Sequence, residues 1–462
     1  MSQRRLFLLI PLAFVVLAQT GMDVRAAQPT WKAGFAKEKI TPGEPMWMSG
    51  YGPRLAKEKI HDIWIKVLAL EAADGKQAVL ITADVCGFSR LSYDAIVSGI
   101  ERACGLKRDR VMLTCTHTHT GPALRECLHV CWPWAERDAR ELVEQYSLGL
   151  ESQVVAAAKR AISELQPAVL STGAGTTDFA VNRRNNKEPD VPAIREKGES
   201  LRGPVDHSIP VLAVRTPEGK LRTVVFGYAC HATTLALTQW SGDYPGFAML
   251  ALERLQPGAE AMFYQGCGAD QNPIPRRTVE ICREYGERLA AAVNDTLASP
   301  MRPIAPELRS AFAFAELNFK SPLTSEYLKE KSAEKSPQGA LAERYLQQLA
   351  EGRPLDTSHP YAIQVWKLGK DQLWISLAGE VVVDYSLKYK EKFGPRTWVN
   401  GFAHDLVCYV PSTRVLREGG GQEVGVPTCG KGEGRRSACR GTTDFPHANG
   451  PTTSSRASTR RS

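Results

Sequence analysis

Short apolar runs alternate with longer amphipathic stretches along most of the chain, and this alternation constrains the fold more than any other feature. Runs typical of buried strands lie at 77–85, 110–114, 221–231 and 259–267. Stretches typical of helices lie at 138–165 and 278–297. Two late runs, 361–368 and 371–380, flank Gly369 and predict a hairpin. We therefore predict an α/β fold with mixed sheet layers and flanking helices.

The strand-like runs end in polar residues of the kinds that carry chemistry. Five runs end in this way, at Asp84, at His117 and His119, at His231, at Asp270 and Asn272, and at Glu380. In open α/β sheets, sites form at the carboxyl ends of strands, where the loops converge. These five ends therefore predict one shared site.

Two histidines separated by one residue follow the run 110–114. Because strand side chains alternate between faces, His117 and His119 are expected to point the same way. Such a pair either shares a metal ion or divides the work, one imidazole binding metal while the other moves protons. For an isolated pair, hydrogen bonding within a loop is the commoner role, so the rest of the chain must decide.

A hydrolytic zinc site takes three or four ligands from His, Glu, Asp or, less often, Tyr. His117, His231 and Glu380 each follow a different strand-like run. Singly, each is better explained by an ordinary structural role. Taken together, the three residues fit the ligand set of a hydrolytic zinc site.

The order of motifs across residues 31–420 resembles that of the neutral, non-lysosomal ceramidase family. The segments that carry the resemblance are MSGYG (48–52), TCTHTHTGPA (114–123), NRR (182–184), FGYACHATTL (226–235), SGDYPGFA (241–248), GCGADQNP (266–273), AGE (378–380) and VCYVPS (407–412). The combination of THTHTGP with a later CHAT and SGD is far more specific than any single segment.

The resemblance implies a zinc-dependent amidohydrolase, in a bacterial member of the family, that cleaves the N-acyl amide bond of ceramide-like lipids. Its catalytic domain would span residues 27–421. The zinc ligands implied by position are His117, His231, Glu380 and Tyr409. A lipid substrate also implies peripheral contact with a membrane surface.

Further roles follow from the same resemblance. His119 would be a catalytic residue near the metal, and Arg183 would contact the reacting group. Gly50 and Asp270 would lie where substrate binds. Asn272 stands where characterised ceramidases have a serine, so a serine-dependent mechanism is not carried over, and Asn272 is expected to orient the substrate.

The two ends of the chain differ in composition from the body. Residues 1–26 combine Arg4 and Arg5 with an apolar stretch and small residues, which predicts a signal peptide and a secreted or periplasmic protein. Residues 422–462 contain no Leu, Ile, Met, Trp or Tyr, which predicts a disordered basic tail. Gly421 stands where the family has a tyrosine. A frame shift or truncation is favoured over a natural tail that binds an anionic surface.

Charge and cysteine content narrow the alternatives. The formal net charge is +8, but the two ends carry most of it, which argues against a nucleic-acid protein. Eleven cysteines leave at least one thiol outside intrachain disulfides, and Cys127 and Cys131 are spaced for a bridge within a loop. Two other functions stay open: a metallophosphatase or esterase using Asp84, Asp243 and Asp270, and a non-catalytic surface-binding protein.

Overall fold

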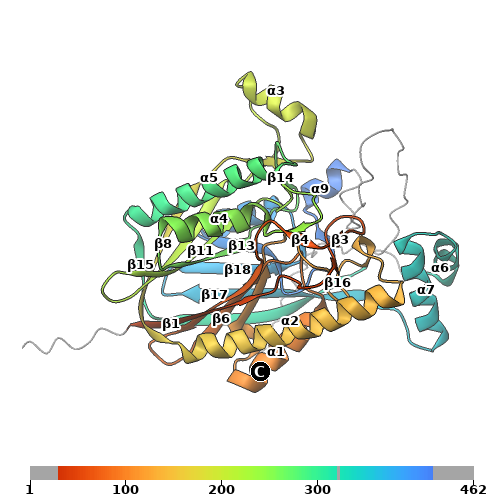
Figure 1. Cartoon of the computed structure of the whole chain (residues 1–462), viewed down its shortest axis with the longest axis horizontal. Coiled ribbons are helices and arrows are strands. Elements are labelled where there is room, and N and C mark those ends of the chain that lie inside the picture. The colour runs from red at the N-terminus through yellow and green to blue at the C-terminus, as the bar shows by residue number, and fades with distance from the viewer. Residues whose placement is uncertain (1–29, 320–322, 420–462) are drawn as a thin grey trace, which may run out of the picture.

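The computed structural model describes residues 30–319 and 323–419 (Figure 1). The predicted signal peptide at 1–26, the predicted tail at 422–462 and Gly421 lie outside the described residues. Within those ranges, no helix combines the length and the apolar character that crossing a membrane requires.

A nine-stranded mixed sheet forms the centre of the fold. Its strand order is β13-β11-β10-β8-β1-β5-β6-β7, and β15 also pairs with β8. The strands are β1 (Trp31–Lys39), β5 (Trp64–Glu71), β6 (Gln77–Ala83), β7 (Val111–Cys115), β8 (Gln166–Thr176), β10 (Ser208–Arg215), β11 (Leu221–Tyr228), β13 (Glu260–Gln265) and β15 (Arg302–Ile304). The pairs β6/β7 and β11/β13 are parallel and the others are antiparallel, so the sheet is mixed, as predicted.

A second sheet of four strands packs against the first. It has the order β16-β17-β18-β20, with β16 (Leu308–Asn318), β17 (Ser358–Leu368), β18 (Gln372–Ala378) and β20 (Trp398–Ala403). Four two-stranded pairs complete the strands of the described ranges: β2 (Met46–Trp47) with β3 (Leu55–Ala56), β4 (Glu58–Lys59) with β12 (Gln239–Trp240), β9 (Ala180–Asn182) with β14 (Gln271–Pro273), and β19 (Glu380–Val381) with β21 (Tyr409–Val410).

Helices cover the outer face of the large sheet (Figure 1). α1 (Arg90–Cys104) and α2 (Arg137–Ser163) pack over β1, β5, β6 and β7, and α4 (Asp243–Leu255) and α5 (Val279–Ala298) pack over β10, β11 and β13. The other helices are α3 (Val191–Glu196), α6 (Ser325–Ser332), α7 (Pro337–Ala350), α8 (Val383–Phe393) and α9 (Thr413–Glu418).

The two sheets share an apolar layer because the strands of the large sheet are buried on both faces. On β5, Ile65 and Val67 face the helices, whereas Leu68 and Leu70 face the second sheet. Three tryptophans of the second sheet, Trp366, Trp374 and Trp398, join that inner layer. This double burial explains why the runs are almost continuously apolar.

The large sheet curves until its two ends approach one another. Thr82 on β6 donates a hydrogen bond to the carbonyl of Phe263 on β13 at 2.6 Å, and Lys66 on β5 reaches the carbonyl of Ala261 on β13 at 2.8 Å. These contacts join strands that stand far apart in the strand order. The loop after β7 is thereby brought close to the loops after β11 and β13.

The predicted elements are confirmed with small shifts at their ends, and the hairpin forms with Gly369 in its turn at φ 61°. The predicted bridge between Cys127 and Cys131 is wrong. Both residues are buried, and Cys127 is a free thiol. Cys127 instead packs in the apolar cluster beneath α1 and α2, where a thiol behaves as a small hydrophobic side chain.

Candidate metal centre

The loop after β7 is held in a constrained conformation. His117 has φ 56°, which residues other than glycine rarely adopt. Thr118 and Thr120 on either side of His119 both donate hydrogen bonds to the carbonyl of Ser241, at 2.8 and 2.7 Å. The Ser241 segment therefore fixes the loop that carries both histidines.

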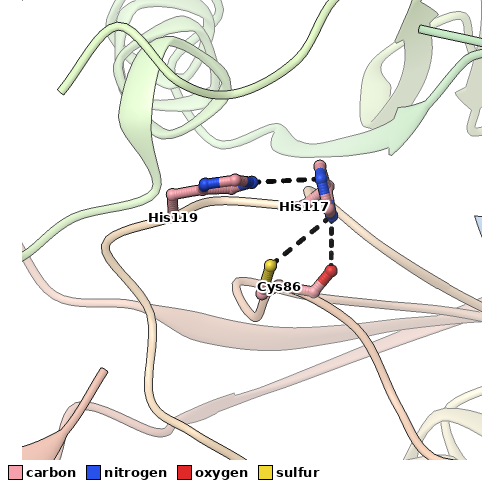
Figure 2. A group of neighbouring side chains, drawn as sticks. All are labelled: Cys86, His117 and His119. Carbon is pink, nitrogen blue, oxygen red and sulfur yellow. Dashed lines mark hydrogen bonds between the residues drawn. The ribbon is translucent and has the colours of Figure 1, made fainter. Parts of the chain in front are cut away.

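Backbone carbonyls orient two of the imidazoles. His117 Nδ1 lies 2.6 Å from the carbonyl oxygen of Cys86, and Figure 2 shows this contact beneath the ring. His231 Nδ1 lies 2.7 Å from the carbonyl oxygen of Gly268. A carbonyl only accepts, so in both rings Nδ1 carries the proton and Nε2 keeps its lone pair. This is the arrangement usual for histidines that bind metal through Nε2.

Glu380 completes a convergent group of ligand atoms. Its Oε2 lies 3.2 Å from His231 Nε2 and 3.7 Å from His117 Nε2. The ligand atoms of His117, His231 and Glu380 all lie within 4.8 Å of one another, and all three residues are buried. Two imidazoles and a carboxylate in this geometry fit a zinc ion with a further ligand position.

Burial keeps the histidines neutral at pH 7. It lowers the pKa of His117 to about 4 and lowers the pKa values of His119 and His231 well below their usual range. A neutral imidazole is the form that binds metal, so no proton has to be displaced at neutral pH.

Tyr409 lies beside Glu380 because β19 and β21 are parallel neighbours that pair these two residues. Its hydroxyl accepts a hydrogen bond from Arg183 Nη2 at 3.1 Å. Burial, and then the negative charge of Glu380, raise the pKa of the Tyr409 phenol above its usual value. The side chain is thus placed at the edge of the ligand group, where the resemblance predicts a fourth ligand.

Arg183 connects Tyr409 with Asn272. Its Nη1 donates to Asn272 Oδ1 at 3.2 Å, and its Nη2 also donates to the carbonyl of Ala269 at 2.5 Å. The guanidinium is therefore fixed at both ends next to the ligand group. A fixed cation in this place is suited to stabilising negative charge that develops on a reacting oxygen.

His119 faces the same ligand group from the other side. Its Nε2 lies 3.2 Å from His117 Nε2 (Figure 2), and its buried Nδ1 has no hydrogen-bond partner in the described part of the chain. Cys86, His117 and His119 form a second group of close ligand atoms. His119 is near enough either to bind metal or to move protons, so both predicted roles stay open.

Gly50 makes room for His119. At φ 90°, a Cβ on Gly50 would lie 2.3 Å from Cγ of the imidazole. Tyr51 packs edge-on against the same ring, with 4.6 Å between the centroids. Gly50 was predicted to lie where substrate binds, and the structure gives it a clear packing reason: only glycine permits this approach.

Asp270 lies in the same region, but its carboxylate is bound by the protein itself. It accepts hydrogen bonds from the backbone N–H of Val383 at 2.9 Å, from Asn182 Nδ2 at 3.3 Å and from Arg414 Nη2 at 3.0 Å. Val383 follows Glu380 by three residues. Asp270 thus holds the segment that carries Glu380, which is a positioning role, and its predicted contact with substrate stays a prediction.

The two other aspartates considered for a two-metal site are used elsewhere. Asp84 accepts from the backbone N–H of Trp64 at 2.9 Å, and Asp243 accepts from those of Thr234 and Leu235 at 3.1 and 2.8 Å. Neither belongs to a group of potential metal ligands in the described ranges. The arrangement therefore favours a single metal ion over a two-metal phosphatase site.

Three contributors escaped the sequence analysis. Cys86 acts through its backbone carbonyl, which has no side-chain signature. Tyr51 and Arg54 follow Gly50, and Arg54 donates to the carbonyls of Ser49 and His119 at 3.0 and 2.6 Å. Tyr51 lies within the MSGYG motif, but no role was assigned to it, and Arg54 follows that motif by two residues.

The chain has the neutral-ceramidase-like fold that its motifs predicted. The neutral ceramidase from Pseudomonas aeruginosa superposes with a TM-score of 0.63 at 20% identity, over 83% of this chain and 69% of that one. A ceramidase complexed with C2 superposes with a TM-score of 0.62 at 18% identity, over 84% and 70%. Searches with family models and against curated protein sequences found no match.

Proposed function

We propose that the protein is a zinc-dependent amidohydrolase that cleaves the N-acyl amide bond of ceramide-like lipids. The observation that carries the proposal is the convergence of His117, His231 and Glu380 in a fold shared with ceramidases. Tyr409, beside Glu380, is the proposed fourth ligand.

A zinc ion held by these residues supplies Lewis acidity, which lowers the pKa of a water molecule and polarises a carbonyl group. The protein groups around it would divide the remaining work. Arg183, fixed by Asn272 and Ala269, stabilises the oxyanion that forms when water adds to the amide carbon. Asn272, which accepts from Arg183, also orients the substrate.

Hydrolysis needs a proton to move from the attacking water to the leaving nitrogen. His119 is placed for this transfer because its Nε2 faces the ligand group and burial keeps the ring neutral and able to accept a proton. The carbon–nitrogen bond then breaks, and the products are a fatty acid carboxylate and a protonated amine. The oxygen of the water is in the carboxylate, and both of its protons are on the amine nitrogen.

Export from the cell is part of the proposal and rests on the composition of residues 1–26. Substrate lipids of this kind lie in membranes, so we propose peripheral contact with a lipid surface.

The test is hydrolysis of a fluorescent N-acyl sphingosine by the purified full chain, with metal content measured by mass spectrometry. We expect about one zinc per chain, loss of activity on chelation and recovery when zinc is returned. Glu391→Gln, an exposed change on α8, serves as the matched control for Glu380→Gln. Activity that survives complete removal of metal, or zinc that persists in Glu380→Gln together with full turnover, would contradict the proposal.

A further inference from the structure

Arg277 is an exposed residue with an unusual backbone, in the connection between β14 and α5. Its φ is 101°, in the region that favours glycine. The backbone N–H donates to the carbonyl of Thr234 at 2.7 Å, which holds the chain in this conformation. Backbone strain of this kind collects at functional sites.

The Arg277 side chain contacts Tyr51, which borders the candidate metal centre. Its Nη1 donates to the Tyr51 hydroxyl at 3.3 Å, and the guanidinium carbon lies 5.7 Å from the centre of the Tyr51 ring. The same ring packs edge-on against His119. One aromatic ring therefore contacts both Arg277 and the histidine that we propose moves protons.

A second guanidinium lies against the same ring. Arg54 has its guanidinium carbon 4.8 Å from the Tyr51 ring centre. Arg54 also donates to the carbonyls of Leu237, Ser49 and His119, so the protein itself holds its guanidinium. The Tyr51 ring therefore contacts two guanidinium groups, of which that of Arg277 belongs to the more exposed residue.

The neighbouring Arg276 differs from Arg277 because a carboxylate neutralises its charge. Glu188 binds it in a bidentate pair, at 2.8 and 2.6 Å. Arg277, one residue later, has no carboxylate at ion-pair distance within the described ranges. The N–H donors of Arg277 that do not bind Tyr51 are consequently available to a carboxylate or a phosphate from outside the chain.

We propose that Arg277 binds an anionic group, a carboxylate or a phosphate, on the amine side of an N-acyl substrate, so that the preferred substrates are acidic N-acyl amides. The proposal rests on the amidohydrolase function proposed above. The acyl chain of such a substrate is apolar, so the charged group has to lie on the other side of the scissile bond. Arg277 then determines which substrates are preferred, and the groups around the metal centre carry out the reaction.

The experiment compares three lauroyl amides on the full chain: N-lauroylethanolamine, which is neutral, its phosphate ester, and N-lauroylglycine. The variants are Arg277→Gly, which removes the side chain and suits the positive φ, and Arg277→Lys, which keeps the charge but not the fork. Arg283→Ala on α5, another exposed arginine, is the matched control. Zinc content and circular dichroism verify that each variant is folded.

For the wild type we expect a kcat/KM on the two anionic amides about ten- to a hundredfold above that on the neutral amide, the range for a hydrogen bond to a charged group. In Arg277→Gly this preference should disappear because KM rises for the anionic amides, whereas kcat/KM for the neutral amide should not change. Arg277→Lys should keep part of the preference. Arg283→Ala should behave as wild type. The two anionic probes separate carboxylate from phosphate recognition.

Equal rates on all three amides, or an equal loss on all three in Arg277→Gly, would overturn the specificity role while leaving the amidohydrolase in place. If none of the amides and no N-acyl sphingosine is cleaved, the proposed function fails. Calorimetric binding of N-lauroylglycine and N-lauroylethanolamine then tests Arg277 separately: a preference for the acid that Arg277→Gly abolishes supports the role, and equal affinities overturn it.

Discussion

Two regions of the molecule concentrate polar side chains in different ways. One is the metal-ligand group of His117, His231 and Glu380. The other is a cavity of about 450 Å³ between the segment 125–135 and α7. The cavity is lined by tryptophans and by residues of both charges, among them Arg125, Glu126, Trp132, Trp134, Glu144 and Arg344.

The two regions differ in how their charges are satisfied. In the cavity, Arg125 pairs with Glu144 at 2.8 Å and with Glu151 at 2.7 Å, and Arg344 pairs with Glu126 at 2.8 Å. In the metal-ligand group, carbonyls hold the Nδ1 atoms of two histidines while the lone pairs of their Nε2 atoms converge on one carboxylate. The cavity therefore lies where side chains neutralise one another, and the convergence of potential metal-ligand atoms, more than open volume, indicates where chemistry is expected.

The largest effects should come from the metal ligands. We expect His117→Ala, His231→Ala and Glu380→Ala each to lower the zinc content and to reduce turnover by roughly 10³-fold or more, because Lewis-acid assistance supplies several kcal/mol. Glu144→Ala in the cavity is the control, and it should keep both the zinc content and the turnover of the wild type. Metal analysis and kinetics measure the outcome, and normal zinc in all three ligand variants would remove the site.

His119 should separate metal binding from proton transfer. If it moves protons, His119→Ala keeps its zinc and loses about 10²- to 10⁴-fold in turnover, the usual range for removal of a general acid or base. Mass spectrometry should measure the zinc content of the same preparation that is used for kinetics, which separates the two roles. Loss of zinc along with activity would make His119 a ligand of the second group, with Cys86 and His117.

Gly50 tests whether the exact position of His119 matters. A methyl group there would press on the imidazole, so Gly50→Ala should lower kcat by about 10²-fold, as expected for a displacement of about 1 Å in a catalytic group. Gly75→Ala is a matched control, because Gly75 has φ 80° and nothing within 4 Å of an added Cβ. Equal kinetics in the two variants would mean that the close contact has no functional consequence.

Asn272 tests the identity of the nucleophile. If water attacks directly, no acyl-enzyme accumulates in the wild type, and Asn272→Ser keeps its zinc with a change in rate within about tenfold, the scale of one hydrogen bond. Intact-protein mass spectrometry during turnover measures any adduct. An acyl group trapped on a side chain would point to covalent catalysis.

The smallest effect should come from the cavity. Arg344→Ala removes an ion pair with Glu126 in which both side chains are partly exposed. We therefore expect the free energy of unfolding to fall by at most about 1 kcal/mol and kcat/KM to stay unchanged. Urea denaturation and steady-state kinetics measure the two quantities. A marked fall in activity would show that the cavity takes part in function and would undo the contrast between the two regions.

Much of the candidate site could be predicted from the sequence, because its residues stand at the ends of recognisable strands. The H-x-H motif, His231 and Glu380 each follow an apolar run, and the structure brings all three into one group. The predicted roles of Arg183, Tyr409 and Asn272 stay predictions, although hydrogen bonds join the three side chains. The hydrogen bonds that Asp270 accepts from Arg414 and Val383 could not be predicted, since the sequence does not show which distant residues a carboxylate meets.

The sequence by itself determined the strands, the helices and the residue types at the ends of the strands, because apolar periodicity and turn residues are local properties of the chain. The tertiary structure alone decided which of these residues meet. The curvature that joins β6 to β13, the carbonyls of Cys86 and Gly268 that set the histidine tautomers, and the strained backbone that turns Arg277 toward Tyr51 all depend on contacts between segments far apart in the chain. Such contacts have no local signature, because they arise only when distant segments pack together.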